Sequence, residues 1–147
     1  MGTGTATWLR LTDRATQRGL YVFNTHWDHR HQGSREQSAR LMALRVRERP
    51  RADEPAVLLG DFNAVENNPA VAHLVSEAGL VDTFQALHPG ERNRRTLHFW
   101  SDSREGPLKV DHILVSRGAV VIDAAIRDGD EPMLSDHFPV TARVAFP

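Results

Sequence analysis

Residues 55–63, PAVLLGDFN, place a short apolar run directly before a glycine and two polar side chains, Asp61 and Asn63. Continuous apolar runs of this length are typical of strands that are buried on both faces of a sheet. Loops at the carboxyl end of such strands commonly carry functional side chains. The stretch therefore predicts a central strand that delivers Asp61 and Asn63 to one end of a sheet.

Strand and helix patterns alternate on both sides of this run. Two segments rich in aliphatic and aromatic residues, 6–11 and 20–25, predict a hairpin that ends at His26. Helical spacing of apolar residues predicts a helix from Ser34 to about Arg49. The remaining expected elements are a helix over 69–78, a polar irregular stretch over 88–107, a hairpin of strands 109–116 and 120–125, and a last strand over 140–146.

Composition limits the classes of protein that the chain can represent. Its 147 residues, 40% hydrophobic and 25% charged, predict one soluble domain. The net charge of −1 gives no general reason to expect nucleic-acid binding, and the lack of cysteine excludes disulfides and thiolate metal sites. No membrane anchor or signal-peptide pattern is visible, so the location stays open, with the cytoplasm favoured.

The polar residues after the central strand suggest phosphoester chemistry. The Asp61 carboxylate could orient or deprotonate a water molecule, while the Asn63 amide, projecting from the same face of an extended segment, could hold a phosphate oxygen. An ordinary turn explains Gly60-Asp61 equally well, because both residues are common in turns.

A second polar segment, 135–140 (SDHFPV), precedes the last expected strand. Asp136 could bind a metal ion, and His137 could contact phosphate as an acid or base. Asp111 could hold the other ring nitrogen of His137 and thereby fix its tautomer. The alternative is a capping aspartate beside a surface histidine.

Other polar residues allow both functional and structural interpretations. His26 could donate to a phosphate oxygen, although a single histidine at a strand end is more often structural. Residues 28–31 raise the idea of a zinc site, but their spacing matches no tetrahedral ligand set. Arginines within 92–95 could steer a phosphorylated substrate or simply form a solvated surface. His98 and Trp100 are predicted to contact substrate, or their segment could be a strand covering the core.

Four segments together resemble the endonuclease/exonuclease/phosphatase superfamily, and within it the bacterial hydrolases. They are NTHWDH at 24–29, GDFN at 60–63, DHI at 111–113 and SDHFPV at 135–140. The resemblance implies metal-dependent hydrolysis of a phosphate ester with Mg²⁺, or with Mn²⁺. It also implies an α/β fold that is the C-terminal half of a four-layer α/β/β/α sandwich, with a mixed, largely antiparallel sheet.

The resemblance also assigns a role to each matching residue. It implies that Asp61 activates water and, with Asp136, lies at the metal, and that Asn63 binds a phosphoryl oxygen. It further implies that His137, held by Asp111, contacts the scissile phosphate, and that His26 hydrogen-bonds phosphate or assists the leaving group.

One departure from the family pattern affects the expected activity. Family members carry a metal-binding glutamate before the Asn-Thr-His motif, and neither Glu36 nor Glu66 has a matching context. We therefore expect residues 1–147 to form a single partial domain that lacks the N-terminal half and is completed by that half or by a homodimer. The alternative function is a non-catalytic remnant that binds a phosphorylated ligand or a partner protein. The substrate class, a small molecule or nucleic acid, stays open, with a small phosphate ester favoured.

Overall fold

The computed structural model describes residues 4–128 and 134–147, and its main feature is a five-stranded sheet with the order β1-β2-β3-β5-β4. The hairpin of β1 and β2 is present as predicted, and β3 runs parallel to β2. β5 pairs antiparallel with both β3 and β4, so the sheet is mixed and largely antiparallel, as expected. The strands are β1 (Thr5–Thr12), β2 (Gly19–His26), β3 (Ala56–Asp61), β4 (Leu80–Asp82) and β5 (Asp111–Ser116).

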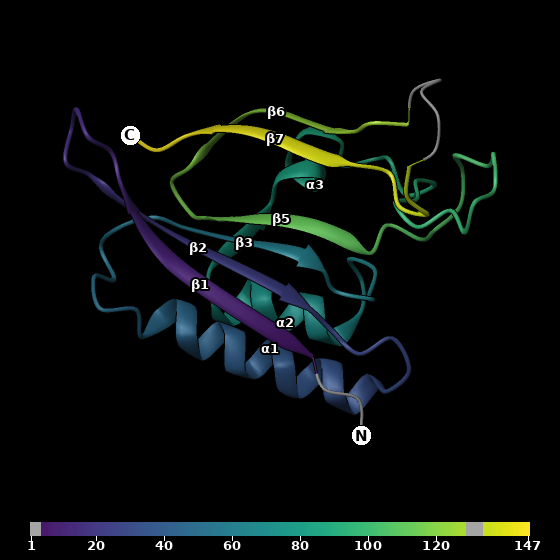
Figure 1. Cartoon of the computed structure of the whole chain (residues 1–147), viewed down its shortest axis with the longest axis horizontal. Coiled ribbons are helices and arrows are strands. Elements are labelled where there is room, and N and C mark those ends of the chain that lie inside the picture. Colours follow the sequence, from purple (N-terminus) through teal and green to yellow (C-terminus); the bar gives the residue numbers. More distant parts are fainter. Residues whose placement is uncertain (1–3, 129–133) are drawn as a thin grey trace.

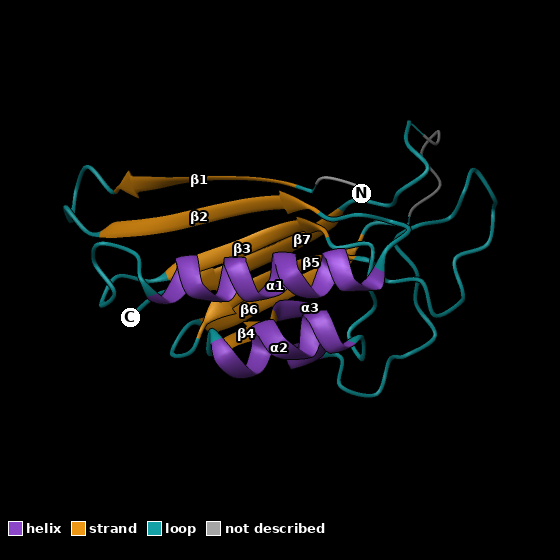
Figure 2. Cartoon of the chain, turned by 90° about the horizontal axis from the view of Figure 1, so that it is seen from below, coloured by secondary structure: helices purple, strands orange, loops and turns teal. Residues whose placement is uncertain are grey.

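Two helices, α1 (Gln32–Arg47) and α2 (Pro69–Glu77), cover one face of this sheet (Figures 1 and 2). α2 begins at Pro69 because the side chain of Asn68 accepts a hydrogen bond from the Ala70 amide and caps the helix. Between the helices and the sheet lies the core. Its largest buried side chains include Tyr21, Phe23, Trp27, Leu58, Phe62, Leu74 and Leu114. In the described part of the chain, no helix is long and apolar enough to cross a bilayer.

The C-terminal strands depart from the sequence prediction. β6 (Val120–Ile126) does not form a hairpin with β5, but pairs antiparallel with β7 (Val140–Ala145) in a separate two-stranded sheet. The prediction was wrong because β3 and β4 already occupy both hydrogen-bonding edges of β5. β4 and α3 (Thr83–Leu87) were not predicted, since elements of three and five residues are too short to show periodicity.

The face of the large sheet turned away from the helices is open along β1 and β2. Trp8 packs against Tyr21 and Phe23, which belong to the core. Side chains alternate between the two faces of a strand, so Leu9 and Leu11 of β1 point to the opposite face. Leu9 and Leu11 are 50% and 51% exposed. This face therefore presents apolar side chains to its surroundings.

Candidate active site

Polar side chains from three neighbouring strands meet at one end of the large sheet. His26 ends β2, Asp61 ends β3 and Asp111 begins β5. The backbone register places His26 opposite Asp61 and Asp61 opposite Asp111. Because directly paired residues project to the same face, the three side chains form a row on the face away from the helices.

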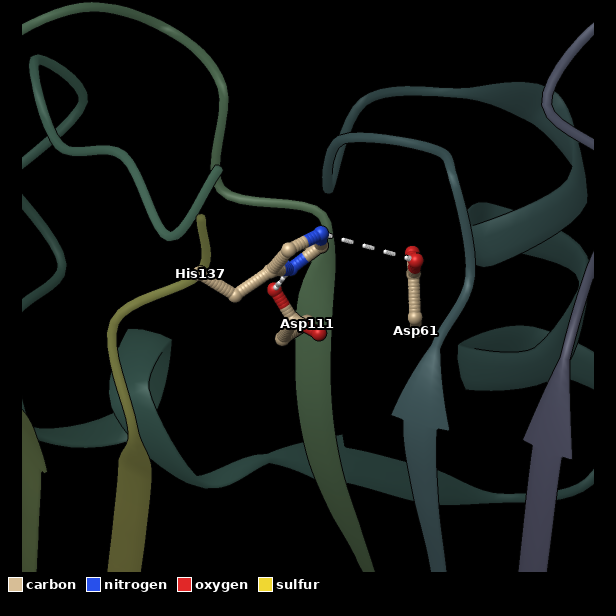
Figure 3. A group of neighbouring side chains, drawn as sticks. All are labelled: Asp61, Asp111 and His137. Carbon is tan, nitrogen blue, oxygen red and sulfur yellow. Dashed lines mark hydrogen bonds and ion pairs between the residues drawn. The ribbon is translucent and has the colours of Figure 1, made fainter. Parts of the chain in front are cut away.

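His137, from the segment before β7, lies beside this row. Its Nδ1 donates a hydrogen bond of 2.7 Å to Asp111 Oδ2, and its Nε2 lies 4.0 Å from Asp61 Oδ2 (Figure 3). The hydrogen bond to Asp111 fixes the ring orientation and leaves Nε2 turned toward Asp61. His26 Nε2 lies 3.3 Å from the same Asp61 oxygen. The structure therefore brings together four of the predicted site residues.

The electrostatic environment shifts the pKa of two of these groups. Burial raises the pKa of Asp61, and the nearby charge of Asp111 adds to the effect, although a hydrogen bond from the Asn63 amide opposes it. Burial acts to lower the pKa of His137. The hydrogen bond to Asp111 and the charges of Asp111 and Asp61 outweigh it, so the pKa of His137 is raised. Asp61 thus holds a proton more readily than an ordinary aspartate, and His137 more readily than an ordinary histidine.

The chain turns sharply around Asp61. Gly60 has φ 136°, and a Cβ there would lie 1.9 Å from the Thr25 carbonyl oxygen, so only glycine fits beside β2. Asn63 has φ 46°; its backbone amide donates to Asp61 Oδ1 at 2.7 Å, and its Nδ2 donates to the Trp27 carbonyl at 2.9 Å. We expected Asp61 and Asn63 to project from one face of an extended segment, and this was wrong. The chain instead turns after Asp61, and the hydrogen bond from the Asn63 amide to the Asp61 carboxylate closes the turn and keeps Asn63 at the site.

The cluster offers ligands of the kind that hard divalent cations prefer. Ligand atoms of Asp61, Asp111 and His137 lie within 4.8 Å of one another, and no other such group of three occurs among residues 4–128 and 134–147. Two carboxylates suit Mg²⁺ and Mn²⁺, and the imidazole is compatible with Mn²⁺. Asp136 is outside this group, although its charge contributes to the raised pKa of His137. Its role as a metal ligand stays a prediction.

The idea of a zinc site within residues 28–31 is not supported by the geometry. Asp28 Oδ1 accepts hydrogen bonds from the backbone amides of Arg30 and His31, at 2.7 and 3.2 Å, and so closes a turn. The hydrogen bond from the Arg30 amide, which has the larger effect, and the one from the His31 amide lower the pKa of Asp28, although burial acts to raise it. His29 Nε2 accepts a hydrogen bond from Arg30 Nε.

The residues predicted to contact substrate lie in the irregular segment before β5. His98 is 1% exposed and stacks on Phe138 at 4.2 Å between ring centroids, so its ring is enclosed. Trp100 is 61% exposed and meets His98 edge-on at 6.4 Å. Arg94 forms an ion pair with Asp128 at 3.0 Å, consistent with a structural role.

A buried polar network lies behind the row, on the helix side of β5, and was not predicted. Asp82 Oδ2 accepts hydrogen bonds from His112 Nδ1 at 2.7 Å and Lys109 Nζ at 2.9 Å, and His112 Nε2 lies 2.9 Å from the Ala64 carbonyl. Burial acts to raise the pKa of Asp82, but the His112 hydrogen bond and the Lys109 charge hold it well below its usual range. The sequence signal was that His112 takes a position in the strand alternation that Val110 and Leu114, two residues away on either side, fill with apolar side chains.

Comparisons with known proteins show which family the chain resembles. A family model described as the Endonuclease/Exonuclease/phosphatase family matches residues 2–137. Among curated proteins, none matches the chain significantly.

Several solved structures share the fold. The mannosyl-6-phosphatase Bt3783 of Bacteroides thetaiotaomicron has a TM-score of 0.82 and 24% identity, over 96% of this chain and 57% of its own. An endonuclease/exonuclease/phosphatase from Bacteroides vulgatus has a TM-score of 0.80 and 27% identity, over 97% and 55%. The human Nocturnin catalytic domain with bound sulfate has a TM-score of 0.77 and 20% identity, over 97% and 53%.

The chain thus spans just over half the length of these structures. The fold agrees with the expected C-terminal half of the sandwich. Since the family model matches most of the chain, the chain belongs to the endonuclease/exonuclease/phosphatase family.

Proposed function

We propose that this chain is part of a metal-dependent phosphoesterase that hydrolyses a phosphate ester with activated water. The observation that carries the proposal is the placement of His137 between Asp111 and Asp61, with Nδ1 bonded to one carboxylate and Nε2 turned toward the other. Membership of the family supports the reaction class. Because the chain spans just over half of its structural relatives, the activity belongs to a more complete assembly of the fold.

Each residue of the cluster has a proposed step. The raised pKa of Asp61 suits a carboxylate that takes a proton from the attacking water. Asp111 holds Nδ1 of His137, so Nε2 can donate a hydrogen bond to a non-bridging phosphate oxygen. His26, whose side chain is 67% exposed, is placed to assist the leaving group, and Asn63 maintains the turn and contributes to phosphate binding.

The proposed cofactor is Mg²⁺ or Mn²⁺, held by Asp61 together with Asp111 or Asp136. When bound, such an ion supplies charge neutralisation at the phosphate and lowers the pKa of coordinated water.

The proposed substrate is a small phosphate ester. Tight non-specific nucleic-acid binding depends on neutralising many phosphates, and the chain has a net charge of −1. Arg94, which could have bound nucleic-acid phosphates, instead forms an ion pair with Asp128. One structural relative is named a mannosyl-6-phosphatase, which is consistent with small-molecule chemistry.

Hydrolysis of a chromogenic phosphodiester and of the matching monoester tests this proposal. For the complete assembly, in which the chain is joined by the missing half or by a second copy, we expect turnover with Mg²⁺ or Mn²⁺, loss of turnover with chelator, and loss of turnover in Asp61→Ala. Asp123→Ala, which removes a half-exposed carboxylate on β6, is the matched control and should retain activity. Turnover that survives chelation would contradict the mechanism. Phosphate binding without turnover, in folded protein, would favour the alternative of a non-catalytic binding remnant.

We also propose that the open apolar face of the large sheet is covered by a polypeptide equivalent to the remaining half of the relatives. Leu9 and Leu11 are half exposed there, and about half of each relative has no counterpart in this chain. The isolated chain should therefore bind an apolar dye such as ANS, and Leu9→Lys with Leu11→Lys should weaken that binding. A monomeric wild-type chain that binds no dye would contradict this proposal. A stable dimer in light scattering would indicate instead that a second copy of the chain covers the face.

A further inference from the structure

Thr96 lies where three segments of the site meet, and it is fully buried. Its backbone amide donates to the Leu108 carbonyl at 3.0 Å, and its carbonyl accepts from the Phe138 amide at 2.7 Å. Its hydroxyl Oγ1 accepts from the amides of Val110 and Asp111, at 3.0 and 3.1 Å. One residue therefore ties the segment before β5 to the segment before β7.

These bonds reach both partners of the Asp111–His137 pair. Asp111 is held through its own amide, and His137 is held through the amide of the next residue, Phe138. A bridge between Leu97 and His137 continues the same pairing. We infer that Thr96 is a positioning residue that sets the Asp111–His137 geometry, an inference that rests on the proposed function of that pair.

The hydroxyl is the part of Thr96 that this role requires. A hydroxyl oxygen has two acceptor positions, which match the two amides that converge on it. Valine has nearly the same shape but cannot accept a hydrogen bond, so the amides of Val110 and Asp111 would lose this partner. The start of β5 would shift to regain partners, and a displacement of about 1 Å in a positioned catalytic group can cost about 10²-fold in rate.

Thr83, the first residue of α3, provides a matched control because its hydroxyl also bonds to β5. It is 1% exposed, and its hydroxyl donates to the β5 main chain at Ile113, with an oxygen–oxygen distance of 3.0 Å. That bond lies on the α3 side of β5 and does not touch Asp111 or His137. Thr83→Val therefore removes an equally buried hydroxyl from β5 and leaves the pair in place.

The test compares Thr96→Val, Thr96→Ser and Thr83→Val by two readouts. The first is kcat and KM for the chromogenic ester. The second is a long-range ¹H–¹⁵N spectrum of the histidine side chains in metal-free protein, which reports whether Nδ1 of His137 carries the proton that it donates to Asp111. Thr96→Val should lower kcat by about 10²-fold and remove the Nδ1–H signature. Thr96→Ser and Thr83→Val should retain both.

Several results would overturn the inference. The first is an unchanged Nδ1–H signature in Thr96→Val. The second is an equal loss of kcat in Thr96→Val and Thr83→Val. The third is the absence of the Nδ1–H signature in Thr96→Ser. Should the valine variant not fold, Thr96→Ala is measured in its place with the same expectations. If the wild-type assembly shows no turnover, the proposed function is in question, but the spectrum still decides whether Thr96 positions the pair.

Discussion

Phosphate-ester hydrolysis by the complete assembly should fall by about 10²- to 10⁴-fold when His137 is replaced with alanine, the range expected for loss of a positioned acid–base group. The ring is anchored to Asp111 at 2.7 Å and lies 4.0 Å from Asp61, so the substitution removes the group that is proposed to contact the phosphate. Its side chain is 26% exposed, so its removal should leave the fold intact. Steady-state kinetics with the chromogenic ester measure the effect.

His29→Ala is the matched control, because His29 is exposed and bonded only to Arg30 among the contacts described for its ring. Equal losses in the two variants would show that the reaction does not use the cluster. A conservative variant, Asp111→Asn, adds a pH test. The Asp111→Asn substitution removes a negative charge that raises the pKa of His137. The His137 ring should therefore lose its proton at a lower pH than in the wild-type protein.

The second large effect is on stability. Asp82→Ala should lower the free energy of unfolding by about 3–5 kcal/mol, the cost of removing one partner from a buried ion pair. Lys109 is 3% exposed and would keep a buried charge without its carboxylate partner. The substitution also removes the oxygen that accepts from the Phe84 and Gln85 amides at the start of α3. Urea unfolding followed by circular dichroism measures the loss.

Asp128→Ala tests whether burial of the ion pair causes the large loss of stability expected for Asp82→Ala. Asp128 forms a comparable 3.0 Å ion pair with Arg94, but their side chains are 24% and 31% exposed, and such pairs contribute only about 0–1 kcal/mol. Similar losses in the two variants would be evidence against the role of burial.

The same network predicts acid sensitivity. The pKa of Asp82 is depressed in the folded state, so its contribution to stability is complete above the pKa of the unfolded chain, about 4. The contribution is lost as the pH falls from there toward the folded-state pKa. Wild-type protein should therefore lose more stability than Asp82→Asn below about pH 4. Parallel stability curves for the two proteins would contradict the assignment.

The main features of the site could be predicted because strand ends are visible in a sequence. The apolar run at 55–59 indicated β3, and with it the position of Asp61. The pairing of β6 could not be predicted, since it depends on β4, a strand of three residues that fills the second edge of β5. Thr96 gave no signal because its hydrogen bonds join residues brought together only by the complete fold.

The register between β3 and β5 has a practical consequence. Asp61 and Asp111 are directly opposed, and like charges in that relation repel each other and weaken the pairing of the strand ends. A cation that binds between them relieves this repulsion, so its affinity is coupled to folding and raises the melting temperature. Thermal-shift measurements across a series of ions can thus rank the cations that fit this site before any substrate has been identified.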